Sequence, residues 1–146
     1  MIHGIADLTE SGKVYVDTPS VIYSVDRIGI YESLLRPLWD AMDAEAIGVV
    51  TSELTLLETL VKPFKDGDGG LAADYERFLT DTRLELHSIS LSILKDAAKL
   101  RAAGLKTPDA IHAATSQLSG CCEFITNDLD FRKVSGLKVV ILKELL

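Results

Sequence analysis

The chain has 146 residues, of which 47% are hydrophobic and 25% charged, a composition that suits one ordered globular domain. It carries 15 basic and 22 acidic residues, so its formal net charge is −7 with the three histidines counted as neutral. This balance argues against a protein that wraps nucleic acid with a generally basic surface. It does not exclude a nuclease, because a nuclease metal site itself needs a cluster of carboxylates.

The cysteines and the N-terminus indicate the compartment. Cys121 and Cys122 are neighbours in the sequence, and adjacent cysteines rarely close a disulfide, so we expect a reduced, cytoplasmic protein. We predict that they form a small buried pair at a strand start. The N-terminal residues lack the basic and apolar regions of a signal peptide, and no apolar run approaches the roughly 18 residues of a membrane helix. No membrane partner is therefore expected.

Strands and helices are predicted to alternate along the chain. Residues 1–12 are expected to form a poorly ordered leader, followed by one domain over 13–146. The predicted elements are strand 13–16, helix 19–25, helix 31–42, strand 47–51, helix 53–62, helix 71–79, strand 84–89, helix 91–100, helix 108–118, strand 123–126 and strand 137–141. This order predicts an α/β fold, with a mostly parallel five-stranded sheet flanked by helices on both faces.

Local signals predict where several helices begin and end. Thr18, Ser52 and Thr107 are predicted N-caps, the first and last of them followed by a proline that suits the first helical position. Pro63 is expected to end the third helix, because proline cannot continue the hydrogen-bond ladder. Gly104 is the expected stop after the fifth helix.

Four acids occupy related positions in this scheme. Asp17 and Asp128 each follow the last apolar residues of a predicted strand, and Glu58 and Asp109 lie in helices that begin after short connections. The carboxyl ends of parallel strands meet at one edge, and ligands bind where the strand order reverses. Crowded carboxylates repel unless a cation neutralises them. Oxygen-only ligands suit Mg²⁺ or Mn²⁺, which would polarise a phosphodiester and activate water.

Each acid also has a structural interpretation. Asp109 would stabilise its helix from the first turn, and Asp128 could cap a turn. Glu58 could be a partly exposed helix residue. Glu53 is more simply a first-turn acid than a member of the site, and His112 is more simply a packed side chain than a ligand or a general base.

Four blocks of sequence cover nearly the whole chain in a fixed order. They are Val14–Thr18 (VYVDT), Ser52–Glu58 (SELTLLE), Thr107–Thr115 (TPDAIHAAT) and Ile125–Asp128 (ITND), with Phe131 close behind. Together they resemble the PIN-domain nucleases, especially the VapC-type toxins of toxin–antitoxin pairs. The resemblance runs from about Val14 to Leu142.

The resemblance implies catalytic, metal-binding roles for Asp17, Glu58, Asp109 and Asp128, with Asp130 close enough to assist or replace Asp128. It implies an endoribonuclease that hydrolyses RNA with Mg²⁺ or Mn²⁺, tRNA being one candidate substrate. It also implies a cognate antitoxin that inserts a segment into the site, and a homodimer.

One position departs from the family pattern. Pro19 stands two residues after Asp17, where relatives often carry Asn or Ser. Thr18 or Ser20 could take over that role, and Thr126 could act near the scissile phosphate. Pro19 favours the alternative of a PIN-fold module that binds RNA or protein without cutting, but the four intact acids argue against it. A phosphatase of the haloacid dehalogenase type would need an aspartate where Pro19 stands.

Overall fold

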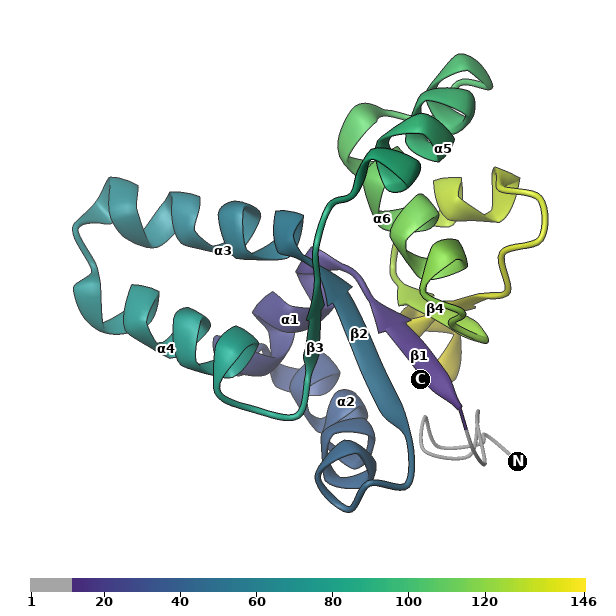
Figure 1. Cartoon of the computed structure of the whole chain (residues 1–146). Helices are drawn as coiled ribbons and strands as arrows, with labels where there is room; N and C mark the ends of the chain where they lie inside the picture. Colours follow the sequence, from purple (N-terminus) through teal and green to yellow (C-terminus); the bar gives the residue numbers. More distant parts are fainter. Residues whose placement is uncertain (1–11) are drawn as a thin grey trace.

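A single five-stranded sheet organises the protein (Figure 1). The structure is a computed structural model that describes residues 12–146, so the expected leader, apart from Gly12, lies outside the described residues. The strands are β1 (Lys13–Val16), β2 (Gly48–Ser52), β3 (Glu85–His87), β4 (Glu123–Thr126) and β5 (Val139–Ile141). Every pair is parallel and the spatial order is β3-β2-β1-β4-β5. The predicted parallel sheet is confirmed.

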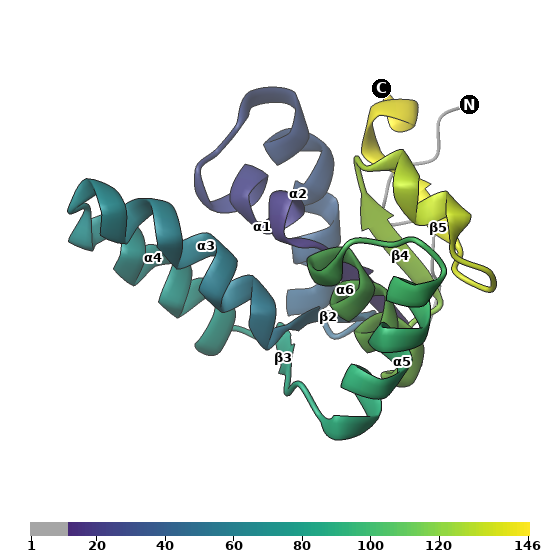
Figure 2. The ribbon, with the colours of Figure 1, turned by 90° about the horizontal axis from the view of Figure 1, so that it is seen from above.

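Helices cover both faces of the sheet, as predicted. They are α1 (Thr18–Val25), α2 (Gly29–Asp43), α3 (Glu53–Asp66), α4 (Gly69–Thr80), α5 (Leu91–Ala102) and α6 (Thr107–Leu118), with short 3₁₀ turns η2 (Leu129–Lys133) and η3 (Leu142–Leu145). Seen from above, α3 and α4 lie side by side and project away from the sheet (Figure 2).

The alternation of side chains along β1 separates two cores. Val14 and Val16 point to the face covered by α1, α2 and α4, where they pack with Leu35 and Leu79. Tyr15 points to the opposite face, which α5 and α6 cover. Successive strand residues face opposite ways, so β1 is buried on both sides, as a central parallel strand must be.

The strand order reverses between β1 and β4. From β1 the chain moves outward to β2 and β3, and it then returns to the other side of β1 to form β4 and β5. The backbone amide of Asp17 donates to the carbonyl of Ile125 at 3.4 Å, so the two strands stay together to their carboxyl ends. Side chains that follow β1 and β4 therefore meet at one edge of the sheet.

Two of the three predicted N-caps are wrong. Asp17 caps α1 by accepting a hydrogen bond from the Ser20 amide, and Thr18 is the first helical residue. Thr107 is likewise the first residue of α6, after Lys106, which makes no side-chain capping bond. In both helices the proline occupies the second position, one step later than predicted. Ser52 caps α3 through the Leu54 amide, as predicted.

Pro63 does not end α3. The helix continues to Asp66 and stops at Gly67, whose φ of 68° is left-handed and easy for glycine. The Pro63 carbonyl accepts the Asp68 amide at 2.8 Å in this helix end. Proline removes only one backbone donor, and here its ring is buried, so packing offsets the missing bond. The stop after α5 at Gly104, with φ of 113°, agrees with the prediction.

The two cysteines do not form a buried pair. Cys121 is half-buried, but Cys122 is exposed, and both thiols are free. The strand β4 begins only at Glu123, so Cys122 lies in the preceding loop rather than in the sheet. Within residues 12–146, no helix is both long and apolar enough to cross a membrane.

Candidate functional site

The four predicted acids line one cavity of about 310 Å³ at the carboxyl edge of the sheet. They come from four separate segments: the β1–α1 junction, α3, the start of α6 and the loop after β4. The side chains that line it include Asp17, Thr18, Glu58, Asp109, His112 and Asp128. The cavity lies where the strand order reverses, which is the expected place for a ligand in an open parallel sheet.

Asp17 is a buried carboxylate with a full set of hydrogen bonds. Only 3% of the residue is exposed. Its Oδ1 accepts from the Ser20 amide at 3.2 Å and from the Ser20 hydroxyl at 2.8 Å, and its Oδ2 accepts from the Thr126 hydroxyl. Burial raises the pKa of Asp17, against the opposing effects of these bonds and of the His112 charge. The carboxylate is thus fixed in orientation but costly to keep ionised.

Ser20 supplies the polar contact that Pro19 lacks. Pro19 lines the cavity, while the Ser20 side chain at the next position orients Asp17. Thr126, predicted to act near the scissile phosphate, donates to the other carboxylate oxygen of Asp17. Both hydroxyls therefore position a carboxylate.

Glu58 is held by two neighbours. Its Oε1 lies 2.8 Å from Nε2 of His112 and 2.6 Å from Oγ1 of Thr18, which donates to it. Partial burial by itself would raise the pKa of Glu58, but the bonds to His112 and Thr18 and the His112 charge outweigh it, so that the pKa is lowered. Glu58 is therefore ionised, and it lines the same cavity as Asp17 and Asp109.

His112 connects this carboxylate to the core. The residue is only 3% exposed, and its Nδ1 lies 2.6 Å from the Tyr15 hydroxyl, which also accepts the Ser52 amide at 3.1 Å. The two ring nitrogens of His112 therefore link Glu58 on one side to Tyr15 on the other. The prediction of a packed histidine is correct as far as burial goes, but His112 also orients an acid of the cavity.

Asp109 and Asp128 form the more open wall. Asp109 is half-buried in the first turn of α6, and Asp128 is exposed. Burial raises the pKa of Asp109, and the charge of Asp128 raises it further, so these carboxylates repel each other across the cavity. Asp128 also caps η2 by accepting the Asp130 amide at 2.9 Å. Asp128 therefore caps η2 and lines the cavity at the same time.

Two other acids lie outside this cavity. Glu53 sits in the first turn of α3, as predicted, and its carboxylate accepts the Ile89 amide at 3.0 Å. Asp130 forms an ion pair with Lys133 at 3.3 Å and lines a neighbouring cavity that shares Asp109.

Of the residues that support the acids, some can be found from the sequence and others cannot. The sequence indicates His112, because it lies three residues after Asp109 and the two side chains are therefore neighbours on the surface of α6. Tyr15 carries no such signal, because a tyrosine in an apolar strand is an ordinary core residue. Its hydroxyl gains a role only when α6 packs against that face of the sheet.

The donor chemistry of the cavity fits a hard divalent cation. Four carboxylates supply oxygen ligands, which Mg²⁺ and Mn²⁺ prefer. Across residues 12–146, however, no three acidic, histidine or cysteine side chains are clustered as a ready-made metal site. Of the four carboxylates, Asp128 is exposed and Asp109 is half-buried, so these two are the less enclosed ones.

Comparison with known proteins gives a single family. The sequence profile of the PIN domain matches residues 14–137, which is most of the chain. No curated protein sequence matches it significantly.

Solved structures share the fold over nearly their whole length. DNA-bound VapBC from Salmonella typhimurium has a TM-score of 0.72 at 19% identity, covering 89% of this chain and 98% of that chain. A sarcin–ricin-loop-cleaving VapC toxin of Mycobacterium tuberculosis has a TM-score of 0.68 at 16% identity, with coverages of 85% and 95%. A toxin–antitoxin complex from Klebsiella pneumoniae reaches 27% identity at a TM-score of 0.63, with coverages of 88% and 97%.

Proposed function

Because the chain belongs to the PIN-domain family of nucleases, we propose that it is a divalent-metal-dependent endoribonuclease, the toxin of a toxin–antitoxin pair. It would act in the cytoplasm on RNA, with tRNA as one candidate substrate. The observation that carries the proposal is the meeting of Asp17, Glu58, Asp109 and Asp128 in one cavity at the strand reversal.

Asp17, Glu58, Asp109 and Asp128 would hold Mg²⁺ or Mn²⁺. Such an ion supplies polarisation of the phosphodiester and activation of water. Ser20 and Thr126 fix both oxygens of Asp17, and Thr18 and His112 fix Glu58, so these two carboxylates need little reorganisation. Burial and the charge of Asp128 raise the pKa of Asp109, so this acid keeps a proton to higher pH than an ordinary aspartate does.

The first test is cleavage of total tRNA by purified protein free of any partner. Reactions contain Mg²⁺, Mn²⁺ or EDTA, in parallel with Asp17→Ala and with the control Glu53→Gln. Glu53 is also an acid of a cavity-bordering helix, but its carboxylate binds Ile89 instead, and glutamine keeps an accepting oxygen. We expect metal-dependent cutting by the wild type and the control, and none by Asp17→Ala. No cutting by folded wild type with either metal would favour the non-catalytic binding module.

The antitoxin is proposed to place a basic segment in the acidic cavity. Four carboxylates surround about 310 Å³, and their repulsion is relieved by a cationic side chain as well as by a metal ion. A peptide from the cognate antitoxin should therefore inhibit cleavage in competition with Mn²⁺. Inhibition that is independent of Mn²⁺ concentration would contradict this arrangement.

A homodimer is proposed to form through an apolar row on α3. Leu57, Val61 and Phe64 are 61%, 55% and 68% exposed and follow helical spacing, so they share one face. The residues that are buried on this helix are Thr55, Thr59 and Pro63. Light scattering should report a dimer for wild type and a monomer for Phe64→Ser. Leu91→Ser, which changes an exposed leucine of α5, is the control.

A further inference from the structure

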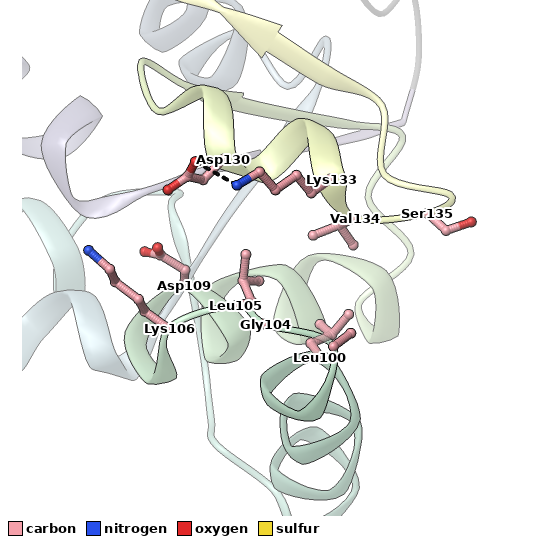
Figure 3. A pocket seen from close by; sticks show the side chains of 10 residues that line it. Leu100, Gly104, Leu105, Lys106, Asp109, Asp130, Lys133, Val134 and Ser135 are labelled. Carbon is pink, nitrogen blue, oxygen red and sulfur yellow. Dashed lines mark ion pairs between the residues drawn. The ribbon is translucent and has the colours of Figure 1, made fainter.

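A second, larger cavity of about 510 Å³ adjoins the acidic one. It lies between the connection from α5 to α6 and the turn η2, and the two cavities share Asp109 (Figure 3). Its volume is in the range of small-molecule sites. Because the two cavities share Asp109, this one lies next to any nucleic acid bound at the acidic cavity.

One part of the lining of this cavity is apolar, and the rest is charged or polar. Leu105 and Val134 are 8% and 7% exposed and belong to the core on that face of the sheet, with Leu100 packed against the same core. At Gly104 an added Cβ would meet nothing within 4 Å, so the backbone there leaves open space. This part of the lining suits a weakly polar group.

Two lysines stand at the edge of the cavity. In Figure 3, Lys106 lies beside Asp109, and Lys133 with its ion-pair partner Asp130 lies across from them. Lys106 and Lys133 are exposed and line the cavity. In a chain of net charge −7, phosphate contacts have to be supplied by local cations, and these two adjoin the acids.

We propose that this second cavity receives one unstacked nucleobase of the RNA strand, with Lys106 and Lys133 contacting the phosphates on either side of it. The inference rests on the proposed nuclease function and names the substrate form, which is single-stranded or looped RNA. A base flips readily from such a strand, whereas a duplex has to lose a stacked pair first. An apolar wall next to cations matches the two chemistries of a nucleotide, the base and its phosphate.

The test fills the cavity with a bulky side chain and compares the binding of strands that carry bases with that of a strand that lacks them. Ala103 is exposed and lines the cavity, whereas its exposed neighbour Ala102 does not, so Ala103→Trp is matched by Ala102→Trp. Fluorescence anisotropy in Mg²⁺ measures binding of labelled hexa-adenylate and hexa-uridylate and of an abasic hexamer with the same phosphates. A gel confirms that each strand is still intact during the measurement.

Wild type and Ala102→Trp should bind the hexanucleotides about tenfold tighter than the abasic strand, the effect of accommodating one base. Ala103→Trp should bind the hexanucleotides and the abasic strand with the same affinity. Lys106→Ala and Lys133→Ala should each reduce the slope of log affinity against log salt by about one, and Lys95→Ala, on the exposed side of α5, should not. Equal binding of base-containing and abasic strands by wild type overturns the proposal.

Cleavage of total tRNA separates this inference from the proposed function. If wild type cuts tRNA and Ala103→Trp still prefers the hexanucleotides to the abasic strand, the proposal of a base-binding cavity is wrong. The proposed nuclease function is then unaffected. Folded wild type that neither cuts nor binds RNA overturns both. If Ala103→Trp instead loses a co-expressed antitoxin and keeps its RNA affinity, the cavity is a protein contact and the proposal is wrong.

Discussion

The two walls of the acidic cavity are built in different ways. The inner wall, Asp17 and Glu58, is tied by hydrogen bonds to Ser20, Thr126 and His112. The outer wall, Asp109 and Asp128, is more open. Its two carboxylates repel each other and are not tied to the core by a comparable set of hydrogen bonds.

The inner wall therefore contributes the position of its carboxylates, and the outer wall contributes negative charge that a cation can neutralise. A carboxylate that is already fixed gains little order when it binds a cation, so its contribution is geometric. The outer carboxylates gain relief of repulsion, so their contribution is electrostatic. Substitutions in the inner wall should therefore change the rate most, and those in the outer wall should change the response to metal and to pH.

Asp17→Asn should produce the largest effect and should act in opposite directions on activity and stability. Loss of a metal-binding carboxylate should reduce cleavage at least about a hundredfold. Because burial raises the pKa of Asp17, this residue contributes stability below its ordinary pKa, and that contribution is lost as the pH rises through the raised value. The uncharged variant avoids the loss, so its Tm should exceed that of wild type at neutral pH.

Thermal unfolding from acidic to neutral pH measures this gain. The difference in Tm should shrink toward zero below the ordinary pKa of aspartate, where both side chains are neutral. A variant less stable than wild type at neutral pH would mean that the hydrogen bonds from Ser20 and Thr126 outweigh desolvation.

His112→Ala should weaken the inner wall without removing an acid. Loss of a residue that orients a ligand typically costs about 10- to 100-fold in metal affinity or activity. The Mn²⁺ concentration for half-maximal cleavage should therefore rise, while Ala102→Trp leaves it unchanged. Tyr15→Phe removes only the outer link of this chain and should have a smaller effect in the same direction. An unchanged Mn²⁺ requirement in His112→Ala would assign the histidine to packing alone.

Much of this arrangement is readable from the sequence because it depends on local patterns. β-Branched runs predict the buried strands, and the alternation of strands and helices predicts the parallel sheet. Acids placed directly after strands are predicted to share an edge, and the structure does bring Asp17 and Asp128 to one cavity.

What is missed depends on contacts between distant segments. Tyr15 and His112 are 97 residues apart, and their hydrogen bond exists only because α6 packs on β1. The choice of Asp17 over Thr18 as N-cap is a difference of one residue that preference scales do not resolve. The sequence also does not say whether Leu57 and Phe64 of α3 are buried, because that is decided by what packs opposite them.

Metal should stabilise the protein through the outer wall. A cation that binds only the folded state stabilises it by about 2.7 kcal/mol at a hundred times its Kd. Thermal unfolding with Mn²⁺ against EDTA measures this shift, which Asp109→Asn and Asp128→Asn should each reduce. In EDTA, either variant should unfold at or above the wild-type Tm, because one member of a repelling pair is gone. A wild-type Tm that is the same in Mn²⁺ and EDTA would contradict a metal site here.

Asp130→Asn should have the smallest effect, a shift in the protonation of its neighbour. Burial is the main cause of the raised pKa of Asp109, but the charges of Asp128 and Asp130 add to it. Protons compete with metal for this carboxylate, so metal-dependent cleavage should fall, as the pH is lowered, earlier than an ordinary aspartate would predict. Removing the Asp130 charge lowers the Asp109 pKa and moves this acidic limb to lower pH.

Carbon-13 NMR of the Asp109 carboxyl in metal-free protein follows the same titration without relying on activity. Asp74→Asn, which removes a charge from the exposed face of α4, is the control and should leave the titration unchanged. If Asp130→Asn leaves the Asp109 titration in place while Asp128→Asn moves it, the repulsion is confined to the acidic cavity. If neither variant moves it, burial alone sets the Asp109 pKa, and the outer wall is governed by desolvation as the inner wall is at Asp17.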